Sequence, residues 1–269
     1  GEDEVDRYKN DLYARQVVPI GKSTITLSGR ANNHESVDSK LTYDVAVAIP
    51  VQFMTFHSHY GTGFRSQSLY ELSGAFLTSF GRFEVGNEEL EPEESTSWDA
   101  GVTMATPLGK LGVTYFENEI EHRIEFVGSS YANLDSLYEV SGIEAFHEIA
   151  FTPDLSIRTS MTKTYQEGLL DIPQDQYSAV ATWKHGKILA RASWYYMGDQ
   201  RIGVFNLNTF ETDVIGQSGR NVVDLYLSYK ALKDVTFFMK ADNLLDENYT
   251  EAAFRTPGAT FIGGVEVKF

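Results

Sequence analysis

The chain has 269 residues, a formal net charge of −16, 13% aromatic residues and no cysteine. No apolar run approaches the roughly 18–20 residues that a membrane-spanning helix requires, which excludes a helical membrane protein. The 22 Lys and Arg residues are scattered, and together with the net charge this excludes nucleic acid as a partner. The absence of cysteine excludes a disulfide framework and thiolate metal sites.

Residues 1–9 read as a polar external loop or a disordered N-terminus, and strands are expected from about Asn10 onward. Segments of about ten residues then alternate apolar with polar, and this period of two predicts strands with two different faces. Four C-terminal segments show it best, with apolar faces of Ile188, Ala190, Ala192 and Trp194; Val223, Leu225, Leu227 and Tyr229; Val235, Phe237, Met239 and Ala241; and Phe261, Gly263, Val265, Val267 and Phe269. One face of each strand therefore suits lipid and the other suits water.

The connections between these strands alternate in length. Short turns are expected near residues 19–22, 49–51, 107–110, 152–154, 185–187 and 231–234. Longer polar stretches lie between them, at about residues 31–40, 61–95, 127–135, 166–176, 198–220 and 244–259. Outer-membrane barrels have this alternation of short periplasmic turns and long external loops. The pattern predicts an all-β, transmembrane antiparallel barrel with about 13 strands in this chain, ending at Phe269.

An odd number of strands leaves two explanations open. A lone bacterial barrel normally has an even number of strands, and an open sheet edge cannot lie in hydrocarbon because its backbone groups would be unpaired. Either one strand is miscounted, or strands from elsewhere close the barrel. We favour the second explanation.

Several stretches, in order, resemble the barrel of TonB-dependent outer-membrane receptors. Residues 60–72 (YGTGFRSQSLYEL) resemble the family segment GFRAPSLYEL, with Ser66 and Gln67 where Ala and Pro are usual. Residues 86–97 (GNEELEPEESTS) and 240–249 (KADNLLDENY) are similar to two further family motifs, and PGATF at 257–261 has Ala259 where Arg is common. Structural roles are expected for the matching residues, which are Gly61, Gly63, Phe64, Arg65, Leu69, Tyr70, Glu71, Gly86, Asn87, Leu90, Pro92, Glu93, Asn243, Leu244, Asp246, Tyr249, Pro257, Gly258 and Phe269.

The resemblance implies a location and a partner. Members of the family are integral to the bacterial outer membrane, with about 22 strands around an N-terminal plug domain and a segment that contacts TonB. Residues 10–269 would be the C-terminal part of such a barrel. A second chain would carry the plug and about nine strands, and would contact TonB. The whole would import a scarce nutrient, such as a ferric siderophore, haem or cobalamin, without a cofactor.

Two alternatives from other classes remain. A barrel that closes alone would be a passive porin, and a receptor barrel without transport would be an interaction subunit of an envelope assembly. The sequence identifies no ligand-binding residue for any of these functions.

Three features could suggest other chemistry. His57 and His59 lie on one strand face but are too few for a zinc site. No nucleophile motif such as GxSxG is present, so no catalytic residue and no enzyme is predicted. The acidic run Glu84–Glu94 lacks a calcium-loop spacing and reads as a solvated surface. The aromatic residues Trp98, Trp183, Trp194, Tyr195 and Tyr196 are expected in the girdles at the membrane boundaries.

Overall fold

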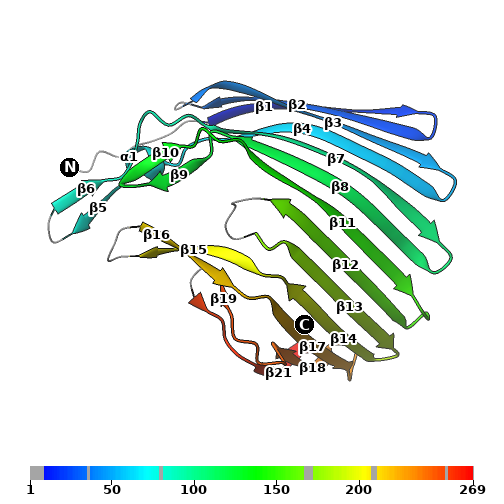
Figure 1. The fold of residues 1–269 in the computed structure, drawn as a ribbon. Helices are drawn as coiled ribbons and strands as arrows, with labels where there is room; N and C mark the ends of the chain where they lie inside the picture. The colour runs from blue at the N-terminus through cyan, green and yellow to red at the C-terminus, as the bar shows by residue number, and fades with distance from the viewer. Residues whose placement is uncertain are drawn as a thin grey trace. The chain divides into compact units, whose positions relative to one another are not determined.

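The structure is a computed structural model that describes residues 9–34, 37–78, 81–166, 172–206, 211–251 and 254–268. Its main feature is one antiparallel sheet of thirteen strands, which confirms the predicted fold class and strand number. Figure 1 shows these strands side by side in chain order. They are β1 (Lys9–Ile20), β2 (Ser23–His34), β3 (Val37–Val51), β4 (Met54–Arg65), β7 (Glu93–Thr106), β8 (Gly109–Glu121), β11 (Tyr138–Ala150), β12 (Leu155–Gln166), β13 (Asp175–His185), β14 (Ile188–Met197), β17 (Arg220–Lys230), β18 (Val235–Asp242) and β21 (Thr260–Val267).

The long connections contain structure that the sequence did not predict. Each of four connections holds a two-stranded hairpin, and one also holds a five-residue helix. These elements are α1 (Leu69–Ser73), β5 (Ala75–Thr78) with β6 (Gly81–Glu84), β9 (Ile124–Val127) with β10 (Ser130–Asn133), β15 (Gln200–Asn206) with β16 (Glu211–Gln217), and β19 (Thr250–Glu251) with β20 (Phe254–Arg255). In the described part of the chain, no helix is long and apolar enough to span a membrane.

The chain divides into two compact units. Unit 1 comprises residues 1–101, 115–141 and 206–211, and unit 2 comprises residues 102–114, 142–205 and 212–269. In unit 1, α1 and the hairpins β5–β6 and β9–β10 lie at one end of the strands, and the short turns lie at the other (Figure 1). In unit 2, β15–β16 and β19–β20 likewise lie opposite the short turns (Figure 1).

The predicted long connection at residues 31–40 is wrong. β2 extends to His34 and β3 begins at Val37, so strand residues occupy most of this stretch. Its polar composition suggested a loop, but the polar side chains bond across the hairpin. The buried Asn32 side chain donates to the carbonyl oxygens of Arg30 and Lys40, both at 3.3 Å. Polar residues here stabilise strand pairing.

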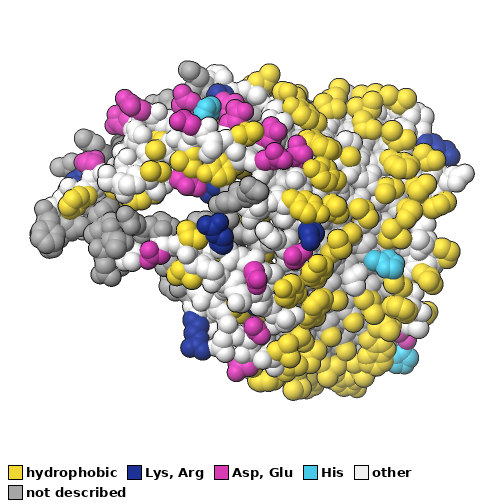
Figure 2. All heavy atoms as spheres, in the orientation of Figure 1, with side chains coloured by type: hydrophobic (Ala, Val, Ile, Leu, Met, Phe, Trp, Pro, Cys, Tyr) yellow, Lys and Arg dark blue, Asp and Glu magenta, His cyan; other side chains and the backbone are white. Residues whose placement is uncertain are grey.

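The register of unit 2 places apolar and polar side chains on opposite faces. One cross-strand row consists of Trp183, Ala190, Leu227, Met239 and Gly263. The adjacent row, on the opposite face, consists of Thr182, Arg191, Tyr226, Lys240 and Ile262. Met239 and Phe261 on the apolar face are 67% and 71% exposed, as a surface that contacts lipid requires. Figure 2 shows apolar side chains spread over the strands.

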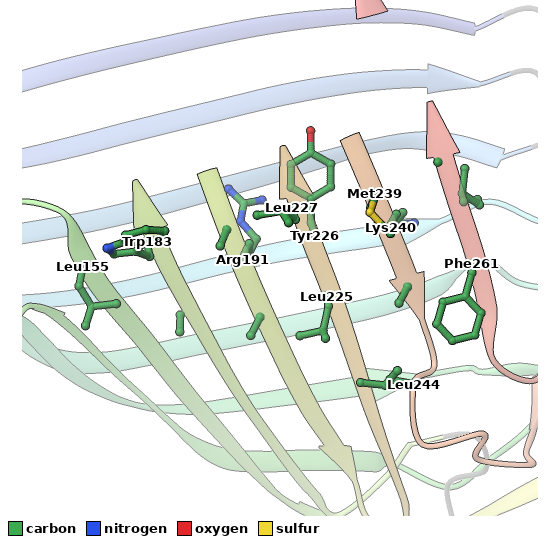
Figure 3. Close-up of a pocket in the computed structure, with 16 residues that line it drawn as sticks. Leu155, Trp183, Arg191, Leu225, Tyr226, Leu227, Met239, Lys240, Leu244 and Phe261 are labelled. Carbon is green, nitrogen blue, oxygen red and sulfur yellow. The ribbon is translucent and has the colours of Figure 1, made fainter. Parts of the chain in front are cut away.

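The apolar face of unit 2 has a groove of about 640 Å³. Large side chains flank it, and Ala181, Ala190, Ala192, Ala241 and Gly263 supply little volume between them. Figure 3 shows the flanking residues, which include Trp183, Leu225, Leu227, Met239 and Phe261. The alternation of large and small residues explains why this face is grooved.

Most of the predicted girdle aromatics lie on the apolar face. Trp98 contacts Tyr115 with a distance of 5.2 Å between ring centroids, and Tyr196 stacks on Tyr177 at 5.9 Å. The Trp194 indole donates to the side-chain oxygen of Asn221 at 3.0 Å. Tyr195 was placed wrongly in this group, because strand alternation puts it on the face opposite Trp194 and Tyr196.

Candidate functional site

The loop end of unit 1 is organised by the short helix α1. Ser68 is its N-cap: the Ser68 hydroxyl accepts from the Glu71 backbone N–H at 3.1 Å, and the Glu71 carboxylate accepts from the Ser68 N–H at 2.6 Å. This reciprocal pair is a capping box, which satisfies two backbone donors that the helix leaves free. The spacing of Ser68 and Glu71 was the signal in the sequence that could have predicted α1.

Arg65, at the end of β4, joins α1 to the start of β7. Its Nε and Nη2 donate to the two carboxylate oxygens of Glu93 at 2.7 and 2.8 Å. Its Nη1 donates to the Glu71 carboxylate at 3.0 and 3.1 Å. The Glu93 carboxylate also accepts from the Ile124 N–H at 2.8 Å, which attaches the β9–β10 hairpin. We call Arg65, Ser68, Glu71, Glu93 and Ile124 the external hub.

Further hydrogen bonds hold the chain around the external hub. The backbone N–H groups of Gly86 and Asn87 donate to the carbonyl oxygens of Gly74 and Glu71 at 2.9 and 2.8 Å. The Asn87 side chain donates to the Tyr131 carbonyl at 3.0 Å. Gln67, which is only 2% exposed, donates to the carbonyl of Leu90. The motifs at residues 60–72 and 86–97 therefore contact each other at the loop end of unit 1.

Glu71 gives the external hub a dependence on pH. Burial raises the pKa of its carboxyl, but hydrogen bonds from Arg65 and Ser68 outweigh burial and hold the pKa below the ordinary value of 4.5. The carboxylate therefore stabilises the hub fully above about pH 4.5, and this contribution is lost as the pH falls through the lowered pKa. We expect hydrogen exchange at the backbone amides of residues 85–87 to be insensitive to this group from pH 8 to pH 5, after correction for intrinsic rates, and to accelerate at lower pH.

A Glu71→Gln variant is the control for this prediction. In this variant, hydrogen exchange at residues 85–87 should be faster at neutral pH than in the unmodified protein. Its acceleration at low pH should be smaller, and the acceleration that remains comes from Glu93. Equal acid responses in the two proteins would contradict the role given to Glu71.

The loop after β18 in unit 2 is built around Asn243. The Asn243 side chain donates to the Glu247 carbonyl at 2.9 Å and to the Pro257 carbonyl at 3.3 Å, and it accepts from the Glu247 N–H at 2.9 Å. Asn243 and Asp246 have φ of 50° and 53°, a left-handed conformation that Asn and Asp adopt more readily than most residues. Asp246 also accepts from the Ala259 N–H at 2.9 Å. The side chains of the motif thus close the loop on itself.

Tyr249 in the same loop contacts a buried arginine. The Arg220 guanidinium carbon lies 4.6 Å from the centroid of the Tyr249 ring, and Arg220 is 4% exposed. Its Nη1 lies 3.3 Å from the side-chain oxygen of Gln217, whose amide group donates to the Thr250 carbonyl at 2.7 Å. Arg220 therefore holds the β16 end against the 243–259 loop, a role that the sequence did not indicate.

The remaining candidate features from the sequence are the two histidines, the acidic run and Phe269. His59 lies between Asp44 and Asp99, with ring nitrogens 3.6 and 3.5 Å from their carboxylates, and His57 lies on the same strand face. Across the described ranges, no group of three or more His, Asp or Glu side chains is placed to hold a metal ion. The acidic run is dispersed, because Glu84, Glu93 and Glu94 pair with Arg82, Arg65 and Lys40 respectively. Phe269 lies outside the described residues.

These features define a class of protein. Antiparallel strands with one apolar and one polar face, short turns at one end and folded loops at the other are the features of an integral outer-membrane β-barrel. The chain belongs to the TonB-dependent receptor family, since the family model described as "TonB dependent receptor-like, beta-barrel" matches residues 2–244. The predicted family and the outer-membrane location are thereby confirmed.

Individual relatives agree with this membership. The chain is 22% identical to the vitamin B12 transporter BtuB of Vibrio vulnificus over 95% of the chain and 41% of that protein. A variant of the ferric enterobactin receptor PfeA from Pseudomonas aeruginosa has a TM-score of 0.81 at 16% identity, over 98% of this chain and 45% of that one. The siderophore receptor PirA from Acinetobacter baumannii has a TM-score of 0.80 at 13% identity, over 98% and 46%.

The chain thus spans less than half the length of these relatives. Its family consists of outer-membrane transporters and receptors and not of enzymes.

Proposed function

We propose that this chain forms the C-terminal wall and the external loops of a receptor that imports a scarce nutrient, a ferric siderophore, haem or cobalamin, with energy relayed by TonB. The relatives support the class of cargo, since they are named as receptors for ferric enterobactin and siderophores and as a transporter of vitamin B12. In this assignment the external hub and the Asn243 loop hold the cargo-facing loops in place.

The two edge strands of the sheet support the proposal that further strands complete the barrel. In the described part of the chain, β1 pairs only with β2, and β21 pairs only with β18. Unpaired backbone groups of β1 and β21 would each cost several kcal/mol in hydrocarbon. About nine further strands and a plug would complete a barrel of about 22 strands. In this proposal these strands and the plug are supplied from outside the 269 residues.

Native mass spectrometry of the detergent-extracted assembly tests this function. A one-to-one complex with a polypeptide that carries a plug and about nine strands, together with nutrient uptake that stops when either is deleted, is the expected result. A chain that is found alone and conducts ions in a bilayer would establish a porin. Co-purification with other envelope proteins and unchanged uptake would establish an interaction subunit.

A further inference from the structure

Arg220 of unit 2 is a buried cation without a counter-ion. It is 4% exposed, and in the described part of the chain its guanidinium forms no ion pair with a carboxylate. Its Nε is buried and has no hydrogen-bond partner among the described residues. Its Nη1 donates to the side-chain oxygen of Gln217 at 3.3 Å, and this oxygen also accepts from Gln200 at 2.8 Å. Buried charges are normally paired, because the desolvation of an unpaired ion is costly.

The ring of Tyr249 does not replace the missing counter-ion. The guanidinium carbon lies over this ring, 4.6 Å from its centroid. A cation–π contact attracts the charge but supplies no oxygen that accepts an N–H bond. Across the described ranges, Nε and Nη2 therefore both lack an acceptor. These two nitrogens form one edge of the guanidinium, and that edge matches the two oxygens of a carboxylate.

The position of Arg220 indicates where this carboxylate comes from. Arg220 pairs with Met197, while its neighbour Asn221 pairs with Tyr196 of the apolar face, so Arg220 belongs to the polar face. It is the first residue of β17, at the end of that strand opposite the short turn at residues 231–234. The polar face lines the interior of such a barrel, and the end opposite the short turns is external. Cargo would enter at this end.

We propose that Arg220 binds a carboxylate group of the imported nutrient through Nε and Nη2. The inference rests on the proposed function and narrows its cargo to nutrients with a free carboxylate, such as haem or a carboxylate siderophore. Gln217 and Tyr249 position the guanidinium, the first by its side-chain oxygen and the second by its ring. Because Arg220 is buried, the loop that carries Tyr249 shifts to admit the carboxylate, and two charge-assisted hydrogen bonds compensate for this shift.

Isothermal titration calorimetry on the complete receptor tests the proposal with two kinds of probe. Haem and ferric citrate carry carboxylates, whereas cyanocobalamin and a neutral ferric trihydroxamate carry none. A carboxylate probe should bind, and Arg220→Gln should weaken its binding about tenfold or more, as the loss of a charge-assisted pair predicts. Arg220→Lys should have an intermediate effect, because it keeps the charge but loses the two-pronged contact.

A second measurement separates a lost contact from a misfolded loop. The amides of Leu244 and Thr256 donate to the carbonyl oxygens of Val223 and Tyr249, so their hydrogen exchange reports on the loop at residues 244–259. Exchange at both amides should be unchanged in Arg220→Lys, although this variant binds the carboxylate probe less tightly. If haem is the probe that binds, its dimethyl ester should bind the unmodified receptor as weakly as haem binds Arg220→Gln.

Arg255→Gln is the matched control. Arg255 is an exposed arginine of the same loop and donates to the Asn248 side chain, so its replacement makes the same change of charge outside the site. Equal losses in Arg220→Gln and Arg255→Gln, or full affinity in Arg220→Lys, would overturn the proposal. Binding of acetate alone, with neither carboxylate probe bound, would assign Arg220 to a free anion and also overturn it.

The uncharged probes separate this inference from the proposed function. If cyanocobalamin or the ferric trihydroxamate binds and is taken up while haem and ferric citrate do not bind, the role of Arg220 is overturned and the proposed function stands. If none of the four probes binds and none is taken up, both fail.

Discussion

Gly109→Ala is expected to destabilise the folded protein strongly. Gly109 starts β8 after a tight turn, with a φ of +151°, and a Cβ added there would overlap the carbonyl oxygen of Glu148. Neither the strained backbone nor the clash can be relieved by rotating a side chain, because both involve main-chain atoms of paired strands. We expect a loss of about 3–4 kcal/mol in the free energy of unfolding, from backbone strain and steric overlap together.

The measurement is the urea midpoint of the receptor in lipid vesicles, combined with the fraction that keeps its folded electrophoretic mobility without heating. Gly186→Ala is the matched control. Gly186 also has a positive φ, +55°, in a short turn, but nothing lies within 4 Å of an added Cβ. Its cost should be about 1 kcal/mol, the penalty of the left-handed conformation alone. Equal costs at the two positions would show that the contact with Glu148 is unimportant.

Arg65→Ala is expected to open the external hub while the barrel strands stay folded. The substitution leaves two carboxylates, Glu71 and Glu93, close together without their shared cation, and their side chains are only 13% and 16% exposed. The cost of breaking such a partly buried pair is about 2–3 kcal/mol. Hydrogen exchange at residues 85–87 should accelerate by a factor on the order of 30–150.

Two variants control this prediction. Arg82→Ala removes a cation whose partner is Glu84, but both side chains are well exposed at 62% and 70%, so exchange in the hub should not change. Arg65→Lys keeps the charge but loses the two-pronged contact with Glu93, and its effect should be intermediate. Unchanged exchange at residues 85–87 in Arg65→Ala would contradict the role of Arg65.

Alternation of apolar and polar residues was sufficient to predict the sheet. Each strand must present one face to lipid. Apolar residues at every second position, such as Leu225, Leu227, Met239 and Phe261, meet this requirement. The prediction of a long connection at residues 31–40 was wrong because Asn32 satisfies its polar groups across a hairpin, which composition cannot reveal. The helix α1 was missed although Ser68 and Glu71 have the spacing of a capping box.

The sequence by itself determined the class of protein, the number of strands and the resemblance to TonB-dependent receptors, because these depend on local periodicity and on short motifs. Only the tertiary structure decided that Arg65 is shared between Glu71 and Glu93, that Arg220 lies on Tyr249, and that Lys110, Arg158 and Arg191 line one cavity. The physical reason is that ion pairs and cavities depend on strand register and on loop closure. Both bring residues together, and the spacing of these residues in the sequence does not predict their contact.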